Sequence, residues 1–274
     1  MTIQKLKEKS VQYRKEILKY IVGAKAGHTG GSLSCIDILN VLYNEVLNVS
    51  PANFKSPDRD RYIQSKGHCV EALFVTLADC GFFPISDLET LCQYQSHYIG
   101  HPTKKVNGVE QNTGALGHGL PIAVGIALAA KMDEKSYKVY TMLGDGELPE
   151  GSNWEAALTA SHYQLDNLCV IIDNNKLQIT GTNEEVCNTN PIDVKFENFG
   201  WAVKEVDGHN VEALKEVFAS MPFETGKPNL IIAHTVKGKG VHFMENNVKW
   251  HHGVPNAEQY EEAIAELSME LENI

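Results

Sequence analysis

The stretch Gly144-Asp145-Gly146-Glu147-Leu148-Pro149-Glu150-Gly151, followed by Ile171-Ile172-Asp173-Asn174-Asn175, decides the fold of this chain. Each of these polar motifs directly follows an apolar segment, residues 139–143 and 168–172, that has the length and composition of a buried strand. A helix predicted over residues 152–162 separates them. A strand, a helix and a second strand in this order predict two parallel strands whose carboxyl ends lie at the same edge of a sheet.

The alternation continues beyond this stretch, with strands predicted at residues 201–206 and 230–233 and a helix near residues 211–220. We therefore predict an α/β fold, with a doubly wound, mainly parallel sheet covered by helices on both faces. No repeat or linker divides residues 1–274, which are expected to form a single domain with an irregular segment at 236–255.

Other helices are predicted from apolar periodicity and from the residues that end helices. Ser32 is expected to cap a helix that reaches Leu47, and the Ala-rich segment that ends at Ala130 is expected to be a buried core helix. The remaining predicted helices span residues 3–26, 70–79 and 257–271.

Composition excludes several classes of protein. A formal net charge of −11 argues against a partner such as a nucleic acid, whose phosphates would be repelled. The 6 cysteines contain no Cys-x-x-Cys pair, so a disulfide framework or zinc site is not expected. No apolar run is long enough for a signal peptide or a membrane span, and the expected location is the cytoplasm.

The polar ends of the two central strands have the chemistry of a metal site. The Asp145 carboxylate, the Asn175 amide oxygen and a main-chain carbonyl, for which Leu177 is the candidate, are the hard oxygen ligands that Mg²⁺, Ca²⁺ or Mn²⁺ prefers. Backbone N–H groups at the start of the intervening helix are suited to a phosphate. Each motif alone is also a favoured turn composition, but both occur after apolar strands, and this favours a joint metal and diphosphate site.

With these motifs, the sequence resembles the transketolase family and its thiamine diphosphate motif. Further segments resemble the family in the family's own order, so the resemblance covers nearly the whole chain. They are Gly27-His28-Thr29-Gly30-Gly31-Ser32, Asp58-Arg59-Asp60-Arg61, Ser65-Lys66-Gly67-His68, Gly100-His101-Pro102 and His252-Gly253.

The resemblance implies the thiamine-diphosphate-binding fold of the diphosphate (PP) type, with thiamine diphosphate and a divalent metal as cofactors. It implies that Asp145, Asn175 and the Leu177 carbonyl hold the metal. Further cofactor contacts are implied for His68, Gly114, Leu116, Gly144 and Gly146.

The resemblance also implies catalytic roles. His28, His101 and His252 match histidines that line the substrate channel, where imidazoles shuttle protons and donate to sugar oxygens. Glu150 and Glu155 match a carboxylate network between active sites, although acids at the start of a helix also complement the helix dipole without any further role.

The sequence shows no pyrimidine-binding domain, and this predicts a partner. In the family, a glutamate of a second, pyrimidine-binding domain activates the cofactor, and this chain contains no second sheet pattern. We expect a split transketolase in which a separate C-terminal transketolase subunit supplies that domain, in an assembly of two copies of each chain. The implied reaction transfers a two-carbon ketol unit between sugar phosphates.

The chain departs from the family at two positions, with Ala115 and His118 where the family commonly has Pro and Gln. These departures leave open whether its substrate and exact reaction are those of the pentose-phosphate enzymes.

Two alternative functions also stay open. A split 2-oxoacid dehydrogenase or deoxyxylulose-phosphate synthase subunit is the nearest other enzyme. A non-catalytic regulatory subunit that retains the fold is the alternative from another class.

Overall fold

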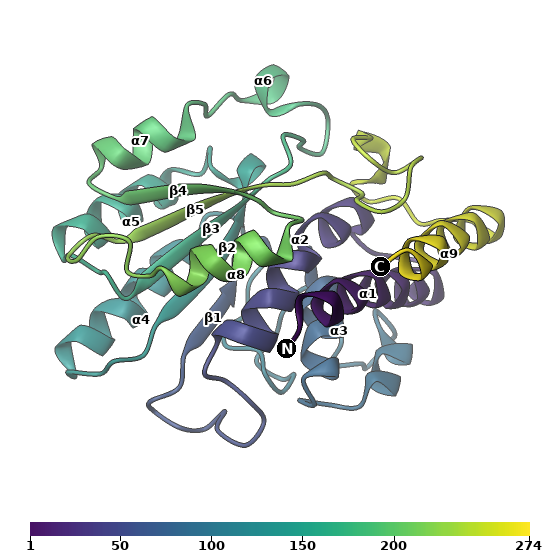
Figure 1. The fold of residues 1–274 in the computed structure, drawn as a ribbon, viewed down its shortest axis with the longest axis horizontal. Helices are drawn as coiled ribbons and strands as arrows, with labels where there is room; N and C mark the ends of the chain where they lie inside the picture. The colour runs from purple at the N-terminus through teal and green to yellow at the C-terminus, as the bar shows by residue number, and fades with distance from the viewer.

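The computed structural model describes all residues, 1–274, and its centre is one five-stranded sheet (Figure 1). The strands are β1 (Arg61–Gln64), β2 (Val139–Gly144), β3 (Leu168–Asn174), β4 (Ala202–Asp207) and β5 (Asn229–His234). Every neighbouring pair is parallel, in the order β1-β2-β3-β5-β4. The predicted α/β fold is therefore confirmed, and β2 and β3 are neighbours.

Helices make up most of the rest of the chain. The α-helices are α1 (Ile3–Ala24), α2 (Thr29–Val41), α3 (Val70–Asp79), α4 (Gly119–Met132), α5 (Gly151–His162), α6 (Asn183–Val186), α7 (Ile192–Asn198), α8 (Val211–Ala219) and α9 (Ala257–Glu272). Shorter elements are a π turn at Leu42–Val46 and the 3-10 turns η2 (Ile85–Thr90), η3 (Asp145–Glu147) and η4 (Val248–Trp250).

The sheet separates two hydrophobic cores, as its alternating side chains require. On β3, Val170 and Ile172 join the core beneath α4, α5 and α7, whereas Cys169 and Ile171 join the larger core on the opposite face. Helices α2 and α8 contribute to that larger core, and α1 packs outside them against α2, α3 and α9. Figure 1 shows helices on both sides of the sheet and α9 beside α1.

Helix α2 begins earlier than the sequence predicted. It starts at Thr29, so Ser32 is not its cap but a buried residue within its first turn. The two glycines before Ser32 have a packing role, because a Cβ on Gly30 would lie 2.9 Å from the Trp250 carbonyl oxygen and one on Gly31 2.5 Å from Cys69 Sγ. Close tertiary packing therefore outweighs the low helix propensity of glycine here.

Helix α4 is not the fully buried core helix that the sequence predicted. Its Leu120 and Ala127 face the core, but Gly125 and Ala129 are exposed, and Met132 is 76% exposed. On the adjacent α5, Leu158 is 55% exposed. The apolar residues of α4 thus lie on two faces of the helix, and only one of these faces is packed within this chain.

None of the helices combines the length and the apolar composition that crossing a bilayer requires.

Candidate functional site

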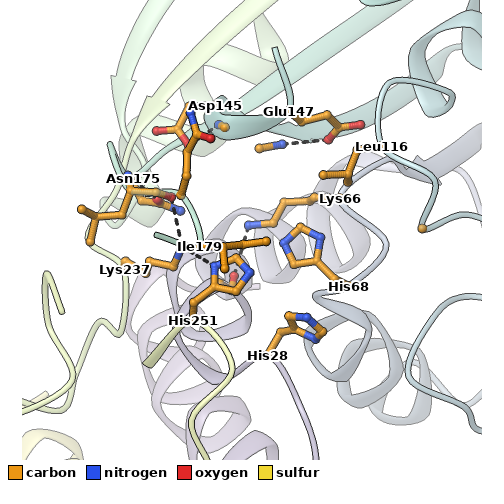
Figure 2. Close-up of a pocket in the computed structure, with 16 residues that line it drawn as sticks. His28, Lys66, His68, Leu116, Asp145, Glu147, Asn175, Ile179, Lys237 and His251 are labelled. Carbon is orange, nitrogen blue, oxygen red and sulfur yellow. Dashed lines mark hydrogen bonds between the residues drawn. The ribbon is translucent and has the colours of Figure 1, made fainter. Parts of the chain in front are cut away.

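A pocket of about 220 Å³ lies at the carboxyl ends of β2 and β3, where parallel sheets commonly bind ligands (Figure 2). Its 16 lining residues come from most of the chain and only 3 of them are hydrophobic, so the pocket suits a polar ligand. All eight residues that the resemblance linked to the cofactor or the metal line it: His68, Gly114, Leu116, Gly144, Asp145, Gly146, Asn175 and Leu177.

Asp145 is a buried carboxylate without a cationic partner. It begins the 3-10 turn η3 directly after β2, and its two oxygens accept the backbone N–H groups of Gly146, at 2.8 Å, and of Lys176. Burial, followed by the negative charge of Asp173, raises the pKa of Asp145 to about 6. A divalent cation beside this carboxylate would offset the cost of its burial.

Asn175 and Leu177 lie on the loop after β3, on either side of Lys176, whose backbone N–H donates to Asp145. The side-chain oxygen of Asn175 accepts the N–H of Leu177 at 3.1 Å, and the carbonyl oxygen of Leu177 accepts the ammonium of Lys237 at 3.0 Å. A carboxylate, an amide oxygen and a carbonyl are thus gathered in one pocket. This donor set fits a hard divalent cation.

Glu147 holds two of the loops that form the pocket. Its carboxylate accepts the N–H of Gly117 at 2.9 Å and the N–H of Gly144 at 3.1 Å, and it also accepts the hydroxyl of Ser65. Burial raises the pKa of Glu147, although these donors oppose the shift. Glu147 therefore connects β2 to the Gly114–Gly119 loop and to the loop after β1.

The helix that follows this motif takes a different position from the expected one. Helix α5 begins at Gly151, and neither Gly151 nor any later residue of α5 lines the pocket. The 3-10 turn η3 intervenes, so the backbone of residues 144–147 faces the pocket in place of the helix N-terminus. The expectation that the start of this helix faces the diphosphate is therefore wrong.

Histidines from distant segments gather at and beside the pocket, which His28 lines and the predicted channel residues His101 and His252 do not. The ring of His28 lies 4.4 Å from that of His252, 5.0 Å from His68 and 6.3 Å from His101, between ring centroids. Burial lowers the pKa of His28 to about 4 and also lowers that of His101. His28 and His101 are thus neutral imidazoles at pH 7, able to donate from one nitrogen and accept at the other.

Lys237 and His251 are among the residues of this pocket that the sequence reasoning missed. The Lys237 ammonium donates to His251 Nδ1 at 2.8 Å, and the ring of His251 stacks on that of His68 at 5.6 Å (Figure 2). Burial, followed by the charge of Lys66, lowers the pKa of Lys237 to about 8. Burial also lowers the pKa of His251 to about 3. Both residues lie in the irregular segment after β5, where no periodic pattern signals a functional position.

Lys66, which lines the pocket, was also missed, and it forms a buried ion pair with Asp173 behind the pocket. Burial opposes the charge on Lys66, but Asp173 outweighs it and holds the pKa of Lys66 above its usual value. A second buried acid, Glu71, accepts the N–H of His28 at 3.2 Å and the hydroxyl of Ser32 at 2.8 Å. The only sequence signal for either acid is a charge inside an otherwise apolar segment.

Glu150 and Glu155 lie outside the pocket. Both are exposed, Glu150 immediately before α5 and Glu155 within it. Glu150 packs beside Gly117, where an added Cβ would lie 2.5 Å from that of Glu150. Within this chain the two glutamates bind no other side chain, so a carboxylate network would need carboxylates from elsewhere.

The two unusual residues of the Gly114–Gly119 loop, Ala115 and His118, are both exposed. His118 Nδ1 lies 3.0 Å from the carbonyl oxygen of Leu116, which lines the pocket. These substitutions therefore change the rim of the pocket and leave its polar lining intact.

Comparison with known proteins agrees with this geometry. Residues 8–272 match the family described as transketolase, thiamine diphosphate binding domain. The chain is 49% identical over 274 residues to one of the subunits of the apulose-4-phosphate transketolase of Phocaeicola vulgatus, covering 100% of this chain and 98% of that protein. It is 39% identical over 258 residues to a 6-deoxy-6-sulfo-D-fructose transketolase subunit from a Clostridium species, covering 94% of each chain.

The structure is similar to that of longer transketolases. The transketolase of Campylobacter jejuni superposes with a TM-score of 0.92 at 33% identity, and the match covers 98% of this chain but 43% of that one. A transketolase from Leishmania mexicana gives a TM-score of 0.88 at 27% identity, over 100% of this chain and 45% of that one. The chain thus corresponds to less than half of these longer enzymes.

Proposed function

Because this chain belongs to the transketolase family, as its thiamine diphosphate-binding domain, we propose that it is the cofactor-binding subunit of a split transketolase. The enzyme would transfer a two-carbon ketol unit between sugar phosphates, and a separate C-terminal subunit would complete its active site. The observation that carries this proposal is the pocket in which Asp145, Asn175 and His68 lie together.

The donor set supports a divalent metal held by Asp145, Asn175 and the Leu177 carbonyl. Mg²⁺ is the first candidate, with Ca²⁺ or Mn²⁺ as alternatives, because all three prefer oxygen ligands. Asp145 is buried with only backbone N–H groups as donors, which is costly for a carboxylate that has no cation nearby. The residues present therefore fit the metal.

The lining of the pocket also suits a diphosphate. His68, Gly144 and Gly146 would contact it, and Lys237 and Lys66 provide positive charge in the same pocket. Gly114 and Leu116 would lie beside the rest of the cofactor. Thiamine diphosphate, once bound, supplies the carbon chemistry of ketol transfer, while the protein positions it and excludes water.

The histidine group is the proposed substrate channel. The rings of His101 and His252 lie beside that of His28, and the lowered pKa values of His28 and His101 keep these two rings neutral, so they can bind sugar hydroxyl groups and move protons between them. The relatives named for apulose-4-phosphate and for sulfofructose favour a substrate that is a sugar carrying an anionic group.

The relatives support a partner subunit for this chain. The relatives matched over nearly their whole length are named as subunits. The apolar surface of α4 and α5, formed by Gly125, Ala129, Met132 and Leu158, is exposed here, and we assign it to the partner. Glu150 and Glu155 lie at the start of α5, where they would meet carboxylates of another subunit. We propose an assembly of two copies of each chain.

Calorimetric titration of thiamine diphosphate with Mg²⁺ tests the proposal, with the chain alone and with the complementing subunit. We expect binding that appears or tightens when the partner is present and is lost in Asp145→Ala. Glu258→Ala, an exposed acid on α9, is the matched control and should bind like the wild type. If neither preparation of the wild type binds the cofactor, the proposal is wrong and a regulatory role becomes the better explanation.

A further inference from the structure

The side chain of Asn175 offers a metal an oxygen in only one of its two orientations. Its amide carries one acceptor oxygen and one donor nitrogen, which exchange places when the amide turns over. If the nitrogen faced the cation, the site would lose a ligand and present a positive dipole to the metal. The N–H of Leu177 donates to the oxygen at 3.1 Å, and the nitrogen needs a matching partner that keeps it turned away from the cation.

The structure contains partners for this nitrogen on the side of Asn175 that faces away from the pocket. Nδ2 of Asn175 donates to Asp173 Oδ2 at 3.2 Å and lies 3.4 Å from Ser34 Oγ. An ionised carboxylate only accepts hydrogen bonds, so the nitrogen must face Asp173 and the oxygen must face away from it. Ser34 donates its own proton to Asp173 Oδ2 at 2.6 Å, which leaves its lone pairs for Nδ2.

Asp173 is itself held from several directions. It is fully buried near the end of β3. Its carboxylate accepts hydrogen bonds from the ammonium of Lys66, on the loop after β1, and from the hydroxyl of Thr235, which follows β5. Together with Ser34 on α2 and Asn175, four donors surround one carboxylate. A buried, fully paired carboxylate of this kind has a fixed position, and the ammonium of Lys66 lies against it.

We infer that Asp173, paired with Lys66 and assisted by Ser34, is a positioning residue that holds the Asn175 amide with its oxygen toward the metal. This inference rests on the proposed metal site. Asp173 does not touch the cation in this arrangement; it acts through Asn175. Lys66, the partner of Asp173, lines the same pocket as Asn175.

The experiment measures Mn²⁺ binding by the loss of the free-ion electron paramagnetic resonance signal, at saturating thiamine diphosphate. It uses the full chain, alone and in complex with the complementing subunit. Asp173→Asn should weaken Mn²⁺ binding at least roughly tenfold, the usual effect of removing an outer partner of a metal ligand. Part of that loss is electrostatic, because a negative charge near the cation disappears.

Asn175→Asp separates the two causes. A carboxylate presents an oxygen whichever way it turns, and beside Asp173 it also repels that second carboxylate. In this background Asp173→Asn should therefore cause no more than the electrostatic loss and, because it relieves the repulsion, less. An equal fold-loss in both backgrounds would overturn the inference. A merely structural role for Asp173 would also give equal losses, because Asn175→Asp repairs orientation and does not repair folding.

Ser34→Ala provides a second route if Asp173→Asn, which leaves the Lys66 ammonium buried and unpaired, fails to fold. It removes the other partner of Nδ2 without burying a charge, and we expect a few-fold loss of Mn²⁺ affinity that disappears in the Asn175→Asp background. The same loss in both backgrounds would contradict the inference. Absence of Mn²⁺ binding by the wild type, alone and in the complex, would instead contradict the proposed function itself.

Discussion

Gly117 donates its backbone N–H to the carboxylate of Glu147 across 2.9 Å, and this bond ties the loop before α4 to the turn after β2. The same carboxylate accepts the N–H of Gly144. Two loops that line the pocket therefore share one buried acceptor.

We predict that Glu147→Ala weakens thiamine diphosphate binding and destabilises the chain. The substitution leaves buried donors without an acceptor, at a cost of about 1–3 kcal/mol each. Glu147→Gln keeps one acceptor oxygen and should lie between the alanine variant and the wild type. Calorimetric titration and thermal unfolding measure the two effects, and an alanine variant with wild-type affinity would show that the loops are held by other contacts.

Gly114→Ala should disrupt the pocket through His101. Gly114 has a φ of 131°, a conformation that side chains other than glycine rarely adopt, and its Cβ would lie 2.3 Å from Cδ2 of His101. We expect reduced cofactor affinity and a lower melting temperature. Gly23→Ala on α1 is the control, because a Cβ there meets nothing within 4 Å, and it should stabilise the chain by roughly 0.5–1 kcal/mol.

The buried acid Glu71 should make stability depend on pH. Burial raises its pKa from 4.5 to about 7, so the folded state binds the proton more tightly than the unfolded state. Stability is therefore lost as the pH rises from 4.5 to 7, by an amount on the order of 3 kcal/mol. Above pH 7 the loss is complete.

Glu71→Gln removes this ionisation and keeps an acceptor for the N–H of His28. We expect the variant to gain melting temperature relative to the wild type at pH 8 and to gain little or nothing at pH 5. Unfolding followed by circular dichroism at both pH values tests this. A difference that is the same at both would show that Glu71 stays in one protonation state over this range. Glu258→Gln, exposed on α9, is the control.

The exposed face of α4 and α5 makes a prediction about assembly. Leu158→Asp places a charge on this face, so it should abolish association with the complementing subunit and leave the melting temperature of the isolated chain nearly unchanged. Val194→Asp introduces the same charge at an exposed position on α7 and should assemble normally. Light scattering after size-exclusion chromatography distinguishes the two, and normal assembly of the Leu158 variant would place the interface elsewhere.

The sequence predicted the parallel sheet because its strands are short apolar runs separated by helices, and this signal is local. It also predicted that Asp145 and Asn175 lie close together, because the ends of neighbouring parallel strands meet at one edge. Both predictions need only the order of the elements.

The parts that escaped prediction depend on contacts between distant segments. Lys66 and Asp173 are separated by 107 residues, and their pairing leaves no trace in either local pattern. Lys237 and His251 lie in a segment without regular structure, so only the fold brings them to the pocket. The predicted start of α2 is wrong for a similar reason, since its glycines reflect the closeness of Trp250 and Cys69.

The packing of α9 against α1 has a consequence for how the chain is made. Ala263 and Leu267 of α9 are fully buried, and α1, the helix they help to cover, leaves the ribosome long before α9 does. The part of the α1 surface that α9 covers therefore stays exposed until α9 emerges. Truncation of α9 would leave the same surface exposed in the finished protein.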